Sequence, residues 1–277
     1  MGLRILTNVA AEAVMKNLRE SSENTSAELE RLSSGKRIIQ ASDDAAGLAI
    51  ATNLHAQTSG LKQATRNAND GISFVQTAEG GLNEVSNILI RLRELAIQSA
   101  SDTVGAQERG FLDEEYQQLT TEIDRISGST KFNGTTLLDG KGGGVLDFHI
   151  GAFSEKNNTI QFDSREADVS TAAIGISGTA VNAKGQALDA VNNLDDAINT
   201  VSGYRAKLGA IQNRLQSTVS TLETQTLNQD AARSTIEDVD VADSTAKLAS
   251  ARIINAAGVS TLAQANAIPS SALKLIG

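Results

Sequence analysis

Hydrophobic residues recur at helical spacing along two long stretches of the chain. In the second half, leucine or valine falls at every seventh residue, at Leu194, Val201, Leu208, Leu215 and Leu222. In the first half, mostly apolar residues alternate steps of three and four, with one irregular step, from residue 50 to residue 96. Heptad spacing sustained this long is typical of helices packed along their sides. The sequence therefore predicts a mainly α fold, built on a long antiparallel helical bundle or coiled coil.

A third stripe predicts a further helix, from about residue 107 to residue 126. Its apolar positions are Phe111, Tyr116, Leu119, Ile123 and Ile126. Helical spacing is weaker in the two terminal stretches, residues 3–32 and 242–268. The C-terminal stripe consists largely of small residues: Ala246, Ala249, Ile253, Ala256, Ala263 and Ala267. Since small side chains bury little apolar area, we expect N- and C-terminal helices that are marginal alone and are ordered by partners.

The helical period is lost between residues 128 and 182. The pairs Asn133-Gly134 and Asp139-Gly140 are turn signals. Two short segments, VLDFHIGAF and NTIQFDS, alternate like strands on either side of residues 156–158. The sequence predicts a small β-hairpin region here, at the tip of the long helical hairpin.

A polar interruption, RLSSGKRIIQASDDAAGLAIA, separates two helical stretches at residues 31–51. An active-site loop, a metal site and a structural joint are the alternatives. Gly35 and Gly47 permit sharp backbone changes, and Ser42 or an aspartate can cap a helix that begins near residue 45. We therefore predict a joint, with Gly35, Asp43, Asp44 and Gly47 as its hinge residues, in preference to a cation site at Asp43-Asp44.

The composition argues against an enzyme. Aromatic residues make up 3% of the chain, there is no cysteine, and the two histidines, His55 and His149, stand in separate contexts. Neither HExxH nor GxSxG occurs, and the run at residues 141–144 lacks the GK[ST] ending of a phosphate-binding loop. We predict no catalytic residues, no metal and no cofactor. The net charge of −9 disfavours nucleic acid as a partner.

Targeting features are also lacking in the sequence. The N-terminal stretch does not form a secretory signal, and the longest apolar block is far shorter than the roughly 20 residues that span a bilayer. We expect a chain with no transmembrane segment that is soluble as made, or exported by a route without a cleaved signal.

A series of collinear segments resembles bacterial flagellin. It includes ERLSSGKRI, SDDAAGLAIA, ATRNANDGISFVQTAEGGLNEV, IRLRELAIQSASDT, LGAIQNRLQSTVSTLETQT and ARSTIEDVDVADSTAKLASARIINAAGVSTLAQAN. Together the matching segments cover most of residues 1–138 and 183–277. The outer domains that many flagellins insert in mid-chain are almost missing, so the resemblance is to a short form.

The resemblance implies a division into named domains. The inner D0 helices would be residues 1–33 and 244–277, which pair with each other. Spoke linkers would be residues 34–46 and 236–243, and the D1 helical domain would be residues 47–235. The interrupted stretch at residues 31–51 would then contain the first spoke, which agrees with a joint.

The resemblance also implies the function. Flagellins are structural subunits that leave the cell through the type III export apparatus and polymerise into the extracellular flagellar filament for motility. The implied partners are other flagellin subunits, an export chaperone, the cap protein and junction proteins. A hook–filament junction protein and a minor flagellin remain the alternatives.

A second implied surface is a ligand site for the host Toll-like receptor that recognises flagellin. Residues 91–96, RLRELA, match the RxRELA stretch of the family, although Ile90 differs from the glutamine common at that position. By resemblance, Arg91, Leu95 and Glu115 are candidate receptor contacts. Packing between subunits is the alternative role for the same residues.

Overall fold

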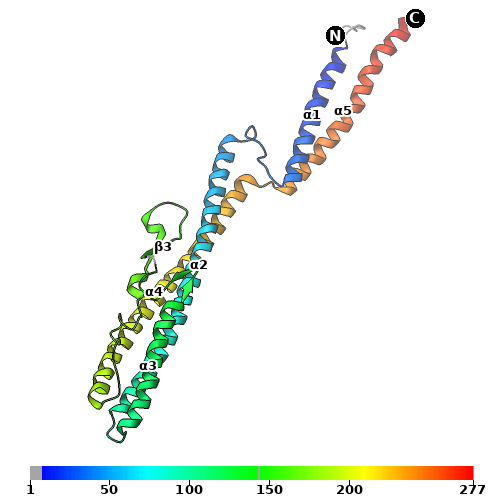
Figure 1. The fold of residues 1–277 in the computed structure, drawn as a ribbon. Helices are drawn as coiled ribbons and strands as arrows, with labels where there is room; N and C mark the ends of the chain where they lie inside the picture. Colours follow the sequence, from blue (N-terminus) through cyan, green and yellow to red (C-terminus); the bar gives the residue numbers. More distant parts are fainter. Residues whose placement is uncertain (1–7, 143, 277) are drawn as a thin grey trace. The chain divides into compact units, whose positions relative to one another are not determined.

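The computed structural model describes residues 8–142 and 144–276, without the side chains of residues 156 and 269–276. It divides into two compact units, the first formed by residues 1–56 and 228–277 and the second by residues 57–227. Two long helices, α2 (Ala45–Ala100) and α4 (Lys184–Glu237), contribute to both units. The prediction of a mainly α fold is confirmed (Figure 1).

The first unit contains an antiparallel pair of helices, α1 (Val9–Ser34) and α5 (Val241–Ile276), which lie side by side (Figure 1). Buried or half-buried side chains recur in steps of three and four on both helices. On α1 they are Ala11, Val14, Leu18, Ser21, Thr25, Glu28 and Leu32, and on α5 they are Ser244, Leu248, Ala251, Asn255, Gly258, Leu262 and Ala265. The predicted pairing of the terminal helices is therefore confirmed; residues 3–7 of the predicted N-terminal helix lie outside the described residues.

Small and polar residues hold this pair together. A Cβ atom at Gly258 would lie 3.0 Å from Cδ1 of Leu18, so glycine permits the close approach of the two helices at this point. The side-chain amide of Asn255 donates to the hydroxyl of Thr25 at 2.7 Å, and that of Asn8 donates to the carbonyl of Ala265 at 3.0 Å. The seam is thus specific in its geometry but buries little apolar area, which makes the pair weak alone.

The predicted apolar stripe of the C-terminal helix does not form this seam. All six of its residues, from Ala246 to Ala267, are exposed, and Ile253 has 70% of its surface accessible. The face that contacts α1 is the opposite one, which carries Ser244, Asn255 and Gly258. The contacting face also carries the half-buried Leu248 and Leu262, so side-chain size alone did not select it. Among the described residues, nothing covers the predicted stripe of α5.

The second unit is built around a long apolar core shared by α2, α3 (Ala106–Ser129) and α4. The predicted row of α4 from Leu194 to Leu222 is buried throughout, and the row of α2 is buried or half-buried from Leu61 onward. Two predicted core positions are wrong. Ile50 is 51% exposed and its neighbour Ala51 is buried instead. Phe111 is 63% exposed, and Leu112 packs against the core in its place.

Two antiparallel hairpins form the β region. The strands are β1 (Lys131–Phe132), β2 (Thr135–Thr136), β3 (Val145–His149) and β4 (Thr159–Asp163), with short 3-10 helices η1 (Lys156–Asn158) and η2 (Ser164–Ala167). The predicted turn at Asn133-Gly134 joins β1 to β2, and both residues have positive φ, 49° and 82°. The predicted strands pair in register, with Asp147 opposite Gln161.

The β region lies along the side of α2, and its predicted position at the tip is corrected by these contacts. Phe74 of α2 meets Phe132, Phe148 and Phe162 edge to face, with ring centroids 5.3–5.7 Å apart. The side-chain amide of Asn67 donates to the carbonyl of His149 at 2.9 Å. The far end of α2 instead meets α3 in a short turn. With aromatic residues so scarce, this phenylalanine cluster is what anchors the β strands to the helices.

Phe74→Ala tests this anchor. Phe74 is 4% exposed, and its truncation removes three aromatic contacts, so we expect the free energy of unfolding of the full chain to fall by about 3–5 kcal/mol. Urea denaturation followed by circular dichroism measures the change. Phe111→Ala is the matched control, because that ring is exposed and its loss should change stability by less than about 0.5 kcal/mol. Equal effects of the two substitutions would contradict the assignment.

Candidate functional site: a helix joint and an exposed ion-pair surface

The joint begins where α1 ends. Gly35 follows the last helical residue in the left-handed conformation, with φ 71°, and its N–H donates to the carbonyl of Arg31 at 2.9 Å. Residues with side chains adopt this conformation at a cost, so glycine is the natural helix terminator here. Gly35 thus has the positive φ that a sharp change of chain direction uses, while its role as a hinge stays a prediction.

A short antiparallel bridge then ties the chain to the end of α4. Lys36 pairs with Asp238, the N–H of Arg37 donates to the carbonyl of Glu237 at 2.7 Å, and the N–H of Val239 donates to the carbonyl of Gly35 at 3.0 Å. The Arg37 guanidinium adds two bonds, from Nε and Nη2, to the carbonyl of Ile236. These bonds satisfy carbonyls that the end of α4 leaves without helical partners. The polar residues between α1 and α2 are therefore engaged in holding the outgoing and returning chains together.

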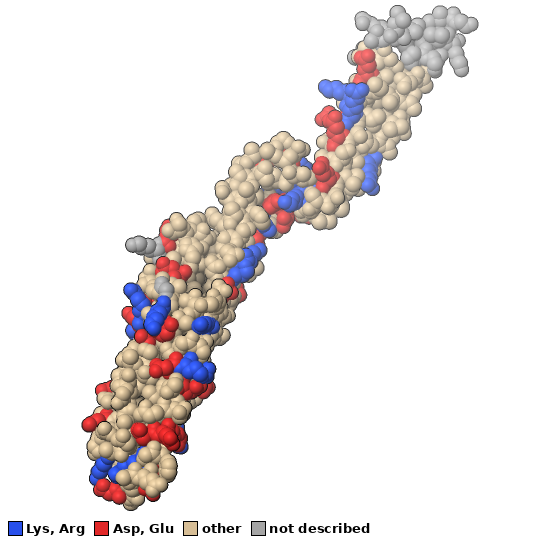
Figure 2. Space-filling model, viewed as in Figure 1, with Lys and Arg blue, Asp and Glu red and all other residues tan. Residues whose placement is uncertain are grey.

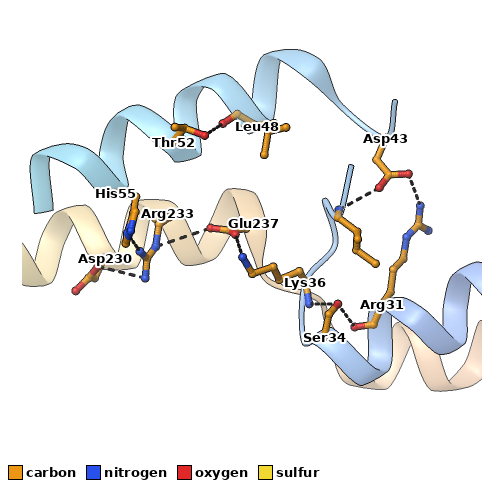
Figure 3. A network of polar contacts seen from close by, with 11 residues as sticks. Arg31, Ser34, Lys36, Asp43, Leu48, Thr52, His55, Asp230, Arg233 and Glu237 are labelled. Carbon is orange, nitrogen blue, oxygen red and sulfur yellow. Dashed lines mark hydrogen bonds and ion pairs between the residues drawn. The ribbon is translucent and has the colours of Figure 1, made fainter. Parts of the chain in front are cut away.

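Asp43 organises the turn before α2. One carboxylate oxygen accepts the N–H groups of Ile39 at 3.0 Å and Gln40 at 3.1 Å, and the other lies 3.7 Å from the guanidinium of Arg31 (Figure 3). The backbone bonds from Gln40 and Ile39, helped by the charge of Arg31, lower the pKa of the Asp43 carboxyl below its ordinary value. Asp43 is therefore a turn-stabilising anion, and its two oxygens are already engaged within the chain.

Asp44 is the cap of α2. Its side chain accepts the N–H of Gly47 at 2.8 Å, and its carbonyl accepts the N–H of Leu48 at 3.0 Å. Of the capping residues that the sequence left open, Asp44 is the one used. Gly47 needs a correction: it lies in the first turn of α2 and does not have positive φ. A Cβ atom there would press on the carboxylate of Asp44 and lie 2.8 Å from Cδ1 of Ile38, so a larger residue would have to displace both side chains.

The candidate receptor residues lie on the second unit. Arg91 of α2 donates from Nε and Nη2 to one carboxylate oxygen of Glu115 on α3, at 3.1 and 2.9 Å, and from Nη1 to Glu94 at 3.1 Å. The hydrogen bonds to Glu115 and then Glu94 raise the pKa of Arg91 above its ordinary value. Arg91, Glu94 and Glu115 are all exposed, so the structure brings the predicted Arg91 and Glu115 together on one accessible surface.

Leu95 does not belong to that surface. It has no accessible area and is part of the core that also contains Leu92 and Tyr116. The prediction of Leu95 as an interface contact is corrected, because its position in the helix turns its side chain inward. Leu95 can affect the surface through the packing beneath it.

Neither histidine is part of a metal centre: within the described ranges, no group of three or more His, Asp or Glu side chains is placed to hold an ion. None of the helices described here is both long enough and apolar enough to cross a membrane.

Comparison with protein families decides the identity of the chain. The bacterial flagellin N-terminal helical region matches residues 5–142, and the bacterial flagellin C-terminal helical region matches residues 191–276. The chain belongs to the bacterial flagellin family. The first match includes the joint, Arg91 and Glu115, and the second includes the returning side of the joint. Residues 143–190 of this flagellin, which include the β3–β4 hairpin, lie outside both matches.

Similar flagellins cover nearly the whole chain. A flagellin of Halalkalibacterium halodurans is 41% identical over 248 residues, 90% of each chain. A flagellin of Bacillus subtilis is 38% identical over an alignment that covers 99% of this chain and 100% of the relative. Among solved structures, Bacillus cereus flagellin is 32% identical with a TM-score of 0.52, covering 61% of this chain and 94% of that one.

The sequence alone missed the residues that close the joint. In the sequence, Lys36 and Arg37 have the character of ordinary basic loop residues. Their partners, residues 236–238, lie some 200 positions further along the chain. The signal that could have found them is the helix end at Glu237, whose carbonyls need donors.

Gly47→Ala tests the space requirement at the joint. The added methyl group would press on the capping carboxylate of Asp44 and on the buried Ile38, so we expect faster hydrogen exchange in residues 36–56 than in the unmodified chain. Gly80→Ala is the matched control in the same helix, because nothing lies within 4 Å of its Cβ position. It should leave exchange unchanged or slow it, since alanine favours helix by about 0.5–1 kcal/mol. Slower exchange in both variants would refute a steric role for Gly47.

Proposed function

We propose that this flagellin is a structural subunit of a bacterial flagellar filament, and that its first unit is held in place by neighbouring subunits. The observation that carries the proposal is the set of large apolar side chains that the α1–α5 pair leaves exposed. Val9 of α1 is 61% exposed, and on α5 Ile253 is 70%, Ile254 58% and Val259 58% exposed. Large apolar side chains that stay exposed along one helix pair mark surfaces that other proteins cover.

The charge distribution supports the same proposal. Figure 2 shows the α5 side of the pair as a largely uncharged surface, with Lys, Arg, Asp and Glu gathered mainly over α1. Between residues 241 and 268, α5 carries three charged residues, Asp243, Lys247 and Arg252, and the first two pair with each other. An uncharged surface bordered by a charged one favours packing of neighbouring α1–α5 pairs side by side in one orientation. Identical contacts repeated from subunit to subunit then extend without closing.

Flagellar filament proteins among the relatives point to the same role. A flagellar filament core protein of Brachyspira hyodysenteriae is 36% identical over 98% of this chain and 99% of the relative. We assign residues 1–33 and 244–277 to the inner D0 layer, with spokes at 34–46 and 236–243 and D1 at 47–235. The first compact unit extends further, to residue 56 and from residue 228, so the opening turns of α2, which we assign to D1, belong to the same compact unit as the spokes.

The weak pairing of α1 with α5 is compatible with export of the chain in an unfolded state. A chain without cysteine has no disulfide to break, and a helix pair that buries little apolar area unfolds at low cost. We propose that the chain passes the type III export apparatus unfolded, with an export chaperone, and then orders as it binds the growing end beneath the cap protein. Its final location is the extracellular filament, and we assign it no catalytic activity.

Assembly tests the proposal. We expect the purified full chain to form filaments when seeded, as seen by electron microscopy, and a chain trimmed of residues 1–35 and 244–277 to remain monomeric. Ile253→Asp should block assembly, because it buries an unpaired charge at the contact. Ile253→Leu is the matched control and should assemble normally.

Two outcomes would count against this function. A full chain that stays monomeric with flagellar seeds would favour the junction-protein alternative. Assembly of Ile253→Asp at the rate of the unmodified chain would show that the exposed face of α5 is not the contact. Deleting the gene and measuring motility and filament length separates a major flagellin from a minor one.

We also propose that the exposed Arg91–Glu115 pair is a contact for the host flagellin receptor. The support is the RLRELA match at residues 91–96 together with the accessible position of Arg91, Glu94 and Glu115. A planar guanidinium held in place by two carboxylates is pre-organised for binding, and arginine is enriched among residues that dominate interfaces.

A reporter-cell assay with purified monomer tests the receptor contact. We expect Arg91→Ala with Glu115→Ala to raise the half-maximal concentration roughly tenfold or more. Arg125→Ala with Glu122→Ala is the matched control, because it removes another exposed ion pair, on α3, and should leave the response unchanged. A reporter that does not respond to the unmodified monomer at concentrations where known agonists saturate would end this proposal.

A further inference from the structure

Phe111 is an exposed aromatic side chain in a chain that has few of them. The sequence contains six phenylalanines and two tyrosines, and Phe111 has 63% of its surface accessible. Glu108, Glu114 and Glu115 lie three or four residues away, on the same side of α3. Glu115 pairs with Arg91, while Glu108 and Glu114 form no ion pair with any described residue. Phe111 is therefore an apolar projection with an acidic border, which we call the Phe111 knob.

A hollow of complementary shape lies on the same unit, between the β3–β4 hairpin and α4. Its volume is about 420 Å³. Its apolar lining comes from β3, β4, η2 and α4 and consists of Val145, Phe162, Ala167, Tyr204, Leu208 and Ile211. Since an apolar cavity of roughly 150 Å³ already accommodates a benzene ring, the hollow has room for the side chain of a phenylalanine.

The uncompensated charge at this hollow is positive. Lys207 and Arg214 of α4 both line it. Lys207 forms an ion pair with Glu166 at 2.8 Å, whereas the guanidinium of Arg214 has no hydrogen-bond or ion-pair partner within the described ranges. Asp163, the other charged residue of the lining, is paired with Arg165. Arg214 thus gives the hollow a charge opposite to that of the Phe111 knob.

The helices that carry the two features have opposite charge. α3 contains six acidic and two basic residues. On α4, residues 197–222 include Arg205, Lys207 and Arg214 and no acidic residue. Complementary charge on two surfaces steers their encounter and fixes the register in which they bind. The knob and the hollow are therefore matched in charge as well as in shape.

The chain cannot place its own Phe111 in its own hollow. The ion pairs that join α2 to α3 and α2 to α4 fix the register of these antiparallel helices. By this register, Phe111 lies beside about residue 95 of α2, and Leu208 in the hollow lies beside about residue 80. The intervening helix is about 22 Å long, which is farther than a side chain reaches. The occupant of the hollow must come from another molecule.

We propose that the Phe111 knob of one copy binds in the hollow of a second copy, with Glu114 beside Arg214. The inference rests on the proposed function, because it names a contact between filament subunits in addition to the exposed side chains of α5. Knob and hollow are different surfaces of one molecule, so the contact is heterologous and extends from copy to copy without closing. Neighbouring second units lie side by side, shifted by about 22 Å along their helices.

Phe111→Ala tests the knob through the critical concentration of the full chain for seeded filament growth. The exposed ring contributes little to folding, but truncating an anchor that is buried in an interface should raise the critical concentration about tenfold or more. Phe153→Ala is the matched control, because that phenylalanine is also exposed, at 57%, and lies outside the knob and the hollow. It should assemble as the unmodified chain does.

A charge exchange tests the pairing of Glu114 with Arg214. Glu114→Arg and Arg214→Glu should each slow filament elongation roughly two- to fivefold, the range expected for an exposed ion pair. The variant that carries both substitutions restores opposite charges across the contact and should recover most of the unmodified rate. Losses that simply multiply in the double variant would show that these residues do not meet, and would overturn the pairing.

Cross-linking tests whether the hollow is the acceptor. The chain has no cysteine, so single cysteines introduced by substitution react without background. Gln107→Cys lies one helical turn from Phe111, and Ala210→Cys lies in the lining of the hollow. When the two variants are mixed and polymerised, a short bismaleimide should join them. Gln107→Cys mixed with Gln225→Cys, exposed farther along α4, is the control and should stay unjoined.

Failure of this contact and failure of the proposed function give different results. An unmodified chain that forms no filaments with seeds refutes the proposed function and this contact together. Filaments in which Phe111→Ala assembles normally leave the function intact and refute the contact. If Phe111→Ala blocks assembly but residues 107 and 210 are not joined, Phe111 binds a different surface, and the hollow is not its acceptor.

Discussion

The burial of leucine and valine rows between α2 and α4 is the interaction on which the second unit depends. Leu82, Leu89 and Leu92 of α2 and Leu194, Leu208 and Leu215 of α4 are almost fully buried in one core. At roughly 25 cal/mol per Å² of apolar area, this seam is the main source of stability. The other elements attach to it. The phenylalanine cluster anchors the β strands, and residues 169–181 run beside α3, where Asp113 and Asp124 accept their N–H groups.

The first unit is stabilised in a different way from the second. The fully buried residues of its helix pair are alanine and serine, and the leucines at the contact, such as Leu18 and Leu248, are only half-buried, so close approach and hydrogen bonds specify the geometry. Other large apolar side chains, such as Ile253, are exposed. Such an element gains most of its stability when another surface covers it. Under the proposed function, this division would couple the ordering of the terminal helices to assembly.

The joint shows how a polar interruption becomes a defined structure. Four of its residues have separate roles: Gly35 ends α1, Asp43 holds the turn, Asp44 caps α2, and Gly47 leaves room for the side chains of Asp44 and Ile38. Arg37 and Lys36 then close the joint against the end of α4. Backbone groups outside helices must find partners, and here short polar side chains supply them. His55 of α2 and Arg233 of α4 add a further polar contact to this set.

The sequence by itself determined the helical rows, the strands, the turn at Asn133-Gly134, the helix end at Gly35 and the family, because these follow from local spacing and local backbone preference. It could not determine which face of α5 meets α1, since both faces carry helical periods and the choice depends on close contact with the partner helix. It placed Phe111 and Leu95 wrongly for a similar reason: inward and outward positions are fixed by neighbouring elements. The partners of Lys36, Arg37 and His55 lie some 180–200 residues away, and only the tertiary structure brings these groups together.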